Sequence, residues 1–106
     1  MRSPFRAATL GLVAATLMTT AAFADDATVK IKSFLFMPMD LQVSQGSTVT
    51  WTNEDEEPHT VTSVDGLFRS GGIDGGGTFR FKFDKPGVYK YTCSIHPQMT
   101  GTITVK

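Results

Sequence analysis

The chain has 106 residues, with ten Lys and Arg against ten Asp and Glu, and it contains a single cysteine. A chain of this length holds one small domain. The balanced charge leaves no basic stripe for nucleic acid, and one cysteine cannot form an internal disulfide.

The first 24 residues predict a secretory signal peptide. Arg2 and Arg6 precede a short apolar run over 7–18, and Ala22-Phe23-Ala24 is a small-x-small cleavage motif. A membrane anchor is the alternative, but the apolar run is rich in Ala and Thr and ends at that motif. No twin Arg is present and no cysteine directly follows the cleavage site, which indicates the general secretory route without a lipid anchor. We therefore expect a mature domain over 25–106, located in the periplasm and without a membrane span.

The mature domain is predicted to consist of short strands separated by turns. The expected strands cover 28–36, 41–43, 48–52, 59–64, 78–83, 88–93 and 100–106. Between them lie breaks at 37–40 and 44–47, an acidic loop over 53–58, a glycine-rich connection over 65–77, and a turn over 84–87. In this turn Pro86 fixes φ, and Gly87 can take a positive φ. Because no segment after the signal peptide has a helical period, the pattern predicts an all-β sandwich or barrel.

Trp51 and the alternating Phe79, Phe81 and Phe83 are expected in the core of this fold. The acidic run Glu54-Asp55-Glu56-Glu57 has two interpretations. It is a solvated loop, or it steers the protein toward a basic partner.

Four side chains with metal-binding chemistry stand out. Cys93, His96 and Met99 follow one another at the spacing C-x2-H-x2-M, and His59 lies upstream at the start of a predicted strand. Taken singly, a cysteine of this kind is usually a small buried apolar residue. In an oxidising compartment, however, a lone thiol is a liability unless it is occupied, and a bound metal would occupy it.

The ligand set favours copper over zinc. Structural zinc sites take four strong ligands, usually Cys and His, for which a thioether is a poor substitute. Two imidazoles, one thiolate and a weak axial Met are typical of a type 1 copper electron-transfer site. Met37 and Met39 are left over, and they fit an apolar rim or packing role better than an additional Cu(I) site.

The sequence resembles the cupredoxins, and within them the amicyanins, with pseudoazurins and plastocyanins as relatives. The resemblance covers nearly the whole mature chain, through the segments 46–53, 58–61, 77–79, 86–93 and 101–105. The two-residue spacers on both sides of His96 resemble the short ligand loop of amicyanins. This resemblance implies a small Greek-key β-sandwich, a cupredoxin-like fold.

The resemblance also implies roles for individual residues. His59, Cys93 and His96 would be the equatorial ligands and Met99 the axial ligand, with His96 as the exposed group through which the electron passes. The residues expected around these ligands are Asn53, Pro58, Thr60, Ser94 and Pro97.

Thr60 departs from the family, in which Asn commonly follows the first His. A contact between the Thr60 and Ser94 hydroxyls would take over its role of joining the two loops. Pro97 has no N–H, so the amide of Thr60 is the expected hydrogen-bond donor to the Cys93 sulfur.

The docking surface is expected at Ile95, His96, Pro97 and Gln98. Ile95 and Gln98 stand where amicyanins have Pro and Phe, so the identity of the partner does not follow from the resemblance.

These observations predict a monomeric periplasmic carrier with one copper ion that cycles between Cu(I) and Cu(II). Its partners would be redox proteins such as a c-type cytochrome or a periplasmic dehydrogenase or reductase. The alternative is a periplasmic copper-binding or copper-delivery protein without a redox role. An enzyme is disfavoured because multicopper oxidases and copper nitrite reductases need more His ligands than the two in this chain.

Overall fold

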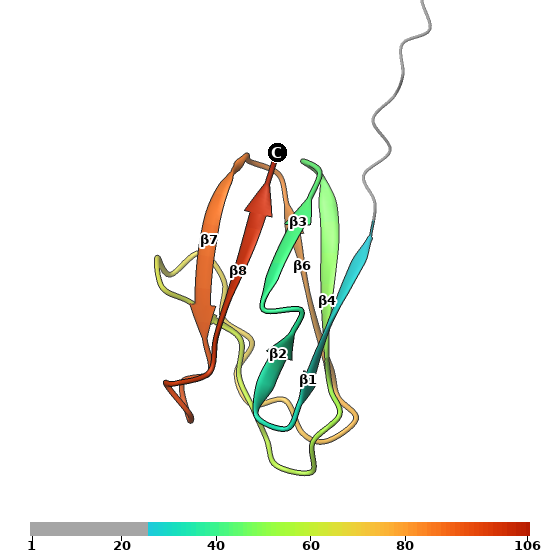
Figure 1. Ribbon diagram of the computed structural model, residues 1–106, viewed down its shortest axis with the longest axis vertical. Helices are drawn as coiled ribbons and strands as arrows, with labels where there is room; N and C mark the ends of the chain where they lie inside the picture. The colour runs from blue at the N-terminus through green and yellow to red at the C-terminus, as the bar shows by residue number, and fades with distance from the viewer. Residues whose placement is uncertain (1–25) are drawn as a thin grey trace, which may run out of the picture.

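The computed structural model describes residues 26–106 as two four-stranded β-sheets (Figure 1). The strands are β1 (Ala27–Lys32), β2 (Leu35–Met37), β3 (Asp40–Val43), β4 (Ser47–Asn53), β5 (Thr62–Ser63), β6 (Thr78–Phe83), β7 (Gly87–Thr92) and β8 (Thr100–Val105). This arrangement confirms the predicted all-β sandwich. The predicted signal peptide and Asp25 lie outside the described residues. Within 26–106 no helix is long and apolar enough to cross a membrane.

Each sheet combines antiparallel and parallel pairs. One sheet has the order β2-β1-β4-β6 and the other β3-β8-β7-β5. β1 runs parallel to β4, with Val29 opposite Trp51, and β3 runs parallel to β8, with Leu41 opposite Ile103. Since the parallel partners are far apart in sequence, the chain crosses between the sheets rather than folding as successive hairpins.

The predicted strand over 28–36 is wrong in one respect, because it is two antiparallel strands. A tight turn at Ser33 and Phe34, with φ of 55° and 59°, separates β1 from β2 and places Phe36 opposite Ile31. Ser and Phe rarely take positive φ, so the local sequence gave no turn cue. Met37, predicted to lie in a break, belongs to β2.

The predicted strand over 59–64 is also shorter than expected. Only Thr62–Ser63 pairs as a strand, while the backbone of His59 exchanges two hydrogen bonds with Ile73 in the glycine-rich connection. The amide of Val61 bonds to the side chain of Ser70 instead of a backbone partner. These side-chain and loop contacts interrupt the ladder just where His59 is held.

The core between the sheets is aromatic. Trp51 and Tyr91 are fully buried and lie edge to face, with ring centroids 5.4 Å apart. Phe83 is buried as predicted, whereas Phe79 and Phe81 are partly buried and pack against the core from the edge strand β6. This rigid core carries the loops at the end of the sandwich opposite the C-terminus (Figure 1).

Candidate metal centre

Three predicted ligands meet at that end of the sandwich. The Cys93 sulfur lies 3.8 Å from His59 Nδ1 and 3.7 Å from His96 Nδ1, and the three donor atoms lie within 4.8 Å of one another. Cys93 and His59 are fully buried, while His96 is partly exposed. Met99, the fourth predicted ligand, is 3% exposed and lies at the end of the same loop. The arrangement can hold a metal ion.

The ligand loop is a closed turn between β7 and β8. The Cys93 amide donates to the Met99 carbonyl at 3.1 Å, the His96 amide to the Cys93 carbonyl at 3.2 Å, and the Met99 amide to the His96 carbonyl at 2.9 Å. Pro97, which lacks an N–H, occupies a position where no backbone donor is required. The two-residue spacers therefore produce two consecutive turns that return the backbone at Met99 to the backbone at Cys93.

Thr60 links this loop to the segment that carries His59. Its amide donates to the Cys93 sulfur at 3.3 Å, and its hydroxyl accepts from the Ser94 amide at 2.7 Å and lies 2.9 Å from the Ser94 hydroxyl. Both contacts predicted for Thr60 are present. The two segments are thus joined although they are more than thirty residues apart.

The Cys93 sulfur sits in surroundings that favour the thiolate. Burial by itself raises the pKa of this thiol, but the Thr60 amide and the His59 and His96 rings outweigh it and lower the pKa to about 6. A thiolate is the form of cysteine that binds metals.

A carboxylate orients the other imidazole. Asp55 Oδ2 lies 2.9 Å from His59 Nε2, and the Asp55 carboxylate also accepts hydrogen bonds from the amides of Ser33 and Phe34. Burial is the largest single influence on Asp55 and raises the pKa of its carboxyl, but the two amides and His59 together outweigh it and hold that pKa below the ordinary value. An ionised carboxylate only accepts hydrogen bonds, so His59 Nε2 carries a proton and donates to Asp55, while Nδ1 lies on the side of the Cys93 sulfur.

Asp55 does not belong to a uniformly solvated acidic loop, as the charge run suggested. Glu54, Glu56 and Glu57 are exposed, whereas Asp55 turns inward. Asn53, fully buried, holds the base of this loop through its amide group, which donates to the carbonyls of Glu57 and Ile73. The one available cue in the sequence is the position of a carboxylate four residues before His59, which by itself is common.

Phe34 is a further residue that the sequence pattern did not single out. Its ring lies edge to face against both imidazoles, with centroids 5.1 Å from His59 and 4.9 Å from His96. It is 39% exposed. Phe34 is therefore a partly exposed ring in contact with both imidazoles.

A model of the cupredoxin-like domain matches residues 7–105 of the sequence. The chain belongs to the cupredoxin family. Amicyanin-alpha of Methylorubrum extorquens is 35% identical over 83 residues, which cover 74% of this chain and 70% of that protein. A purple cupredoxin from Nitrosopumilus maritimus, with a solved structure, is 38% identical with a TM-score of 0.71, over 76% of this chain and 100% of that chain. A copper-containing nitrite reductase from Thermus scotoductus is 33% identical with a TM-score of 0.72, over 77% of this chain but 22% of that chain.

The surface around His96 in this cupredoxin is partly apolar. Ile95 is 51% exposed, and Pro97 and Gln98 are exposed beside it. Pro58, which directly precedes His59, is exposed as well. Met37 and Met39 are about half exposed, which agrees better with the predicted apolar rim at the surface than with packing in the interior.

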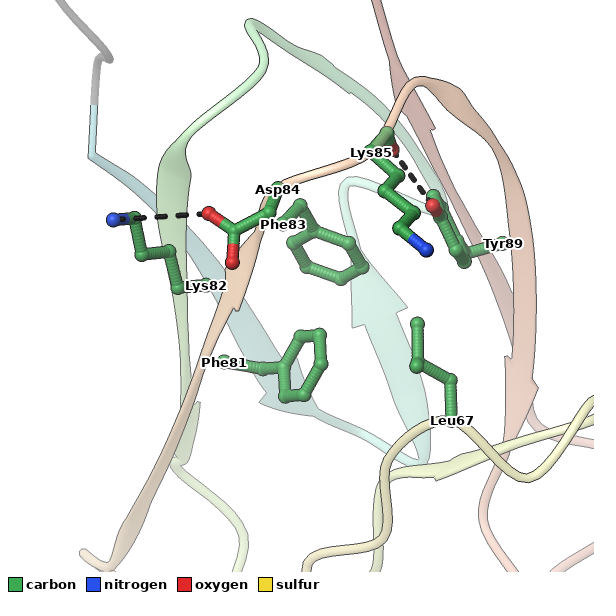
Figure 2. Close-up of a pocket in the computed structure, with 7 residues that line it drawn as sticks. All are labelled: Leu67, Phe81, Lys82, Phe83, Asp84, Lys85 and Tyr89. Atoms are coloured by element: carbon green, nitrogen blue, oxygen red, sulfur yellow. Dashed lines mark hydrogen bonds and ion pairs between the residues drawn. The ribbon is translucent and has the colours of Figure 1, made fainter.

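A shallow pocket lies near the β6–β7 turn, at the end of the sandwich away from the candidate centre (Figures 1 and 2). Its walls are Leu67, Phe81, Phe83 and Tyr89, with Lys82, Asp84 and Lys85 at the turn. Figure 2 shows the Tyr89 hydroxyl donating to the Lys85 carbonyl and Lys82 paired with Asp84. Among residues 26–106, the group of three or more His, Cys, Asp or Glu side chains that could hold a metal ion is His59, Cys93 and His96, at the other end of the sandwich.

Proposed function

We propose that this cupredoxin is a type 1 copper protein that transfers single electrons between redox proteins. The observation that carries the proposal is the convergence of His59 Nδ1, Cys93 Sγ and His96 Nδ1 beside the buried Met99. These four residues would hold one copper ion. When bound, copper supplies a one-electron Cu(I)/Cu(II) couple, and the donor set of imidazole, thiolate and thioether suits both oxidation states.

Contacts within the protein hold these donors in one arrangement. The Cys93 sulfur favours its thiolate form and is fully buried, and His59 presents Nδ1 because Asp55 occupies Nε2. Thr60 and Ser94 hold the two ligand segments together. A site held rigidly in one geometry needs little rearrangement when an electron enters or leaves.

The electron would leave through His96. It is the one imidazole with a partly exposed side chain, and it lies among the exposed Ile95, Pro97 and Gln98. A small apolar surface of this kind suits brief docking with a redox partner. We propose a c-type cytochrome or a periplasmic dehydrogenase or reductase as partner, with Glu54, Glu56 and Glu57 available to attract basic groups.

The proposed location is the periplasm, reached through the predicted signal peptide, and the proposed state is a monomer. A catalytic role is not proposed. Both histidines of the chain belong to this one centre, and the similarity to the nitrite reductase covers only 22% of that chain.

Copper titration of the mature chain tests the proposal. We expect one equivalent of Cu(II) to produce intense visible absorption and a type 1 EPR spectrum, and Cys93→Ser to abolish both while the fold remains. Colourless protein after loading with Cu(II), or colour that persists in Cys93→Ser, would refute the assignment.

A second measurement separates electron transfer from copper delivery. A carrier retains copper over repeated reduction and oxidation and exchanges electrons rapidly with its own oxidised form. Loss of the ion at each reduction would instead indicate delivery, in which the exposed thioethers of Met37 and Met39 would assist transfer.

A further inference from the structure

We propose that Asp55 is a positioning residue that joins the β1–β2 turn to the copper ligands. One carboxylate would orient the His59 ring and at the same time seat Phe34 over both imidazoles. The effect on the copper centre rests on the proposed function, whereas the contacts themselves do not.

The two oxygens of the Asp55 carboxylate are both in use. Oδ1 accepts from the Ser33 amide at 2.7 Å, and Oδ2 accepts from the Phe34 amide at 3.0 Å and from His59 Nε2 at 2.9 Å. The Asp55 amide donates in turn to Asn53 Oδ1 at 2.9 Å, and this bond fixes the backbone of Asp55. Asp55 thus connects three segments of the chain at one point.

The turn that receives this carboxylate is conformationally unfavourable by itself. Ser33 and Phe34 have φ of 55° and 59°, a region that residues other than glycine rarely occupy. Their successive amides point at one carboxylate, and successive backbone N–H groups of this kind form a concave anion site. The hydrogen bonds to Asp55 stabilise the turn and so determine where the Phe34 side chain lies.

The Phe34 ring, placed by this turn, contacts both imidazoles. Its ring stands nearly perpendicular to them, with interplanar angles of 90° to His59 and 89° to His96. Such edge-to-face contacts are favourable. A shift of the turn would therefore change the ring contact on the buried His59 and the surface beside His96.

The hydrogen bond to His59 also has an electronic consequence. A carboxylate that accepts a hydrogen bond from the remaining N–H of a metal-bound imidazole fixes the ring's tautomer and makes the ring a stronger electron donor to the metal. A stronger donor favours Cu(II) over Cu(I), so Asp55 should lower the reduction potential. Removing the carboxylate should raise it.

Asp55→Asn is the informative substitution. An amide offers one oxygen and one NH2 group, so it cannot accept from Ser33 on one side and from Phe34 and His59 on the other. Glu56→Gln is the matched control, since it removes one negative charge from the exposed neighbouring position. The double variant Ser33→Gly with Asp55→Asn relieves the turn at one of its two positive-φ positions and keeps the test available if Asp55→Asn alone folds poorly.

Two readouts are compared in the Cu(I)-loaded mature chain. NMR reports the His59 Nε2 proton and the proximity of the Phe34 ring to both imidazoles, and voltammetry reports the reduction potential. We expect wild type and Glu56→Gln to show a slowly exchanging Nε2 proton and the ring contacts. We expect Asp55→Asn to lose the proton signal to exchange, to weaken the ring contacts, and to raise the potential more than Glu56→Gln does.

Equal potential shifts in Asp55→Asn and Glu56→Gln, together with an unchanged Nε2 proton, would overturn the proposal. If the chain takes up no copper, the proposed function fails instead, and the same NMR comparison on the metal-free chain still decides whether Asp55 holds His59 and Phe34.

Discussion

Replacing Thr60 by Val tests whether one hydroxyl joins the two ligand segments. Thr60 is 6% exposed, and its hydroxyl accepts from the Ser94 amide at 2.7 Å. Valine keeps the shape and the amide that bonds the Cys93 sulfur, but it leaves the Ser94 amide without this acceptor.

Loss of one partner of a buried hydrogen bond costs about 1–3 kcal/mol. Because Ser94 itself is exposed, water replaces part of the lost bond, and we expect about 1–2 kcal/mol. In a domain of this size each kcal/mol lowers the melting temperature by roughly 4–8 °C. The copper-free Thr60→Val variant should therefore melt about 4–16 °C below wild type.

The assay is thermal and urea unfolding followed by the fluorescence of Trp51, the single tryptophan, which is fully buried. Thr104→Val is the control, since Thr104 is half-buried on β8 and its hydroxyl makes no hydrogen bond among the described residues. Thr60→Asn should recover much of the loss, because its amide oxygen can accept from Ser94. If Thr60→Val has the same melting temperature as Thr104→Val and wild type, the Thr60 hydroxyl does not join the two ligand segments and the reasoning is refuted.

Three further predictions concern the core and the ligand thiol. A Cβ at Gly101 would overlap the Tyr91 ring on the neighbouring strand. Gly101→Ala should therefore lower the free energy of unfolding by about 1–3 kcal/mol. Urea unfolding checks this, and an unchanged unfolding midpoint would show that the Tyr91 ring moves aside freely. Burial raises the pKa of Tyr91 from 10 to about 12. Since the folded state then holds the phenol proton more tightly, stability should be full below pH 10 and fall as the pH rises to 12; tyrosinate absorbance should show a late step that is missing in Tyr91→Phe. The pKa of Cys93 is lowered from 9 to about 6, because the Thr60 amide and the two imidazoles outweigh burial. The copper-free protein should therefore gain stability between pH 6 and pH 9, and a Cys93→Ser variant with the same pH dependence in urea unfolding would contradict this.

The parts of the fold that local pattern determines could be predicted from the sequence. Alternation along β4 places Val49 and Trp51 on the buried face, and period-2 patterns identify strands without knowledge of their partners. The C-x2-H-x2-M spacing is likewise local, since two closed turns bring Cys93, His96 and Met99 together. The Thr60 contacts were predicted from the resemblance to the cupredoxins, because Thr60 directly follows His59.

Only the tertiary structure decided what stands around the two imidazoles. Asp55 became a partner of His59 because the loop after β4 meets the β1–β2 turn, and Phe34 reached both rings because that turn adopts two positive φ values. Neither feature has a local cue: Asp55 looked like one carboxylate in a charged run, and Phe34 looked like one residue of a continuous strand. The contact of Asp55 with the β1–β2 turn depends on the pairing of β1 with β4 in one sheet, and the contact of Phe34 with His96 depends on how the two sheets pack. A one-dimensional pattern carries little information about either arrangement.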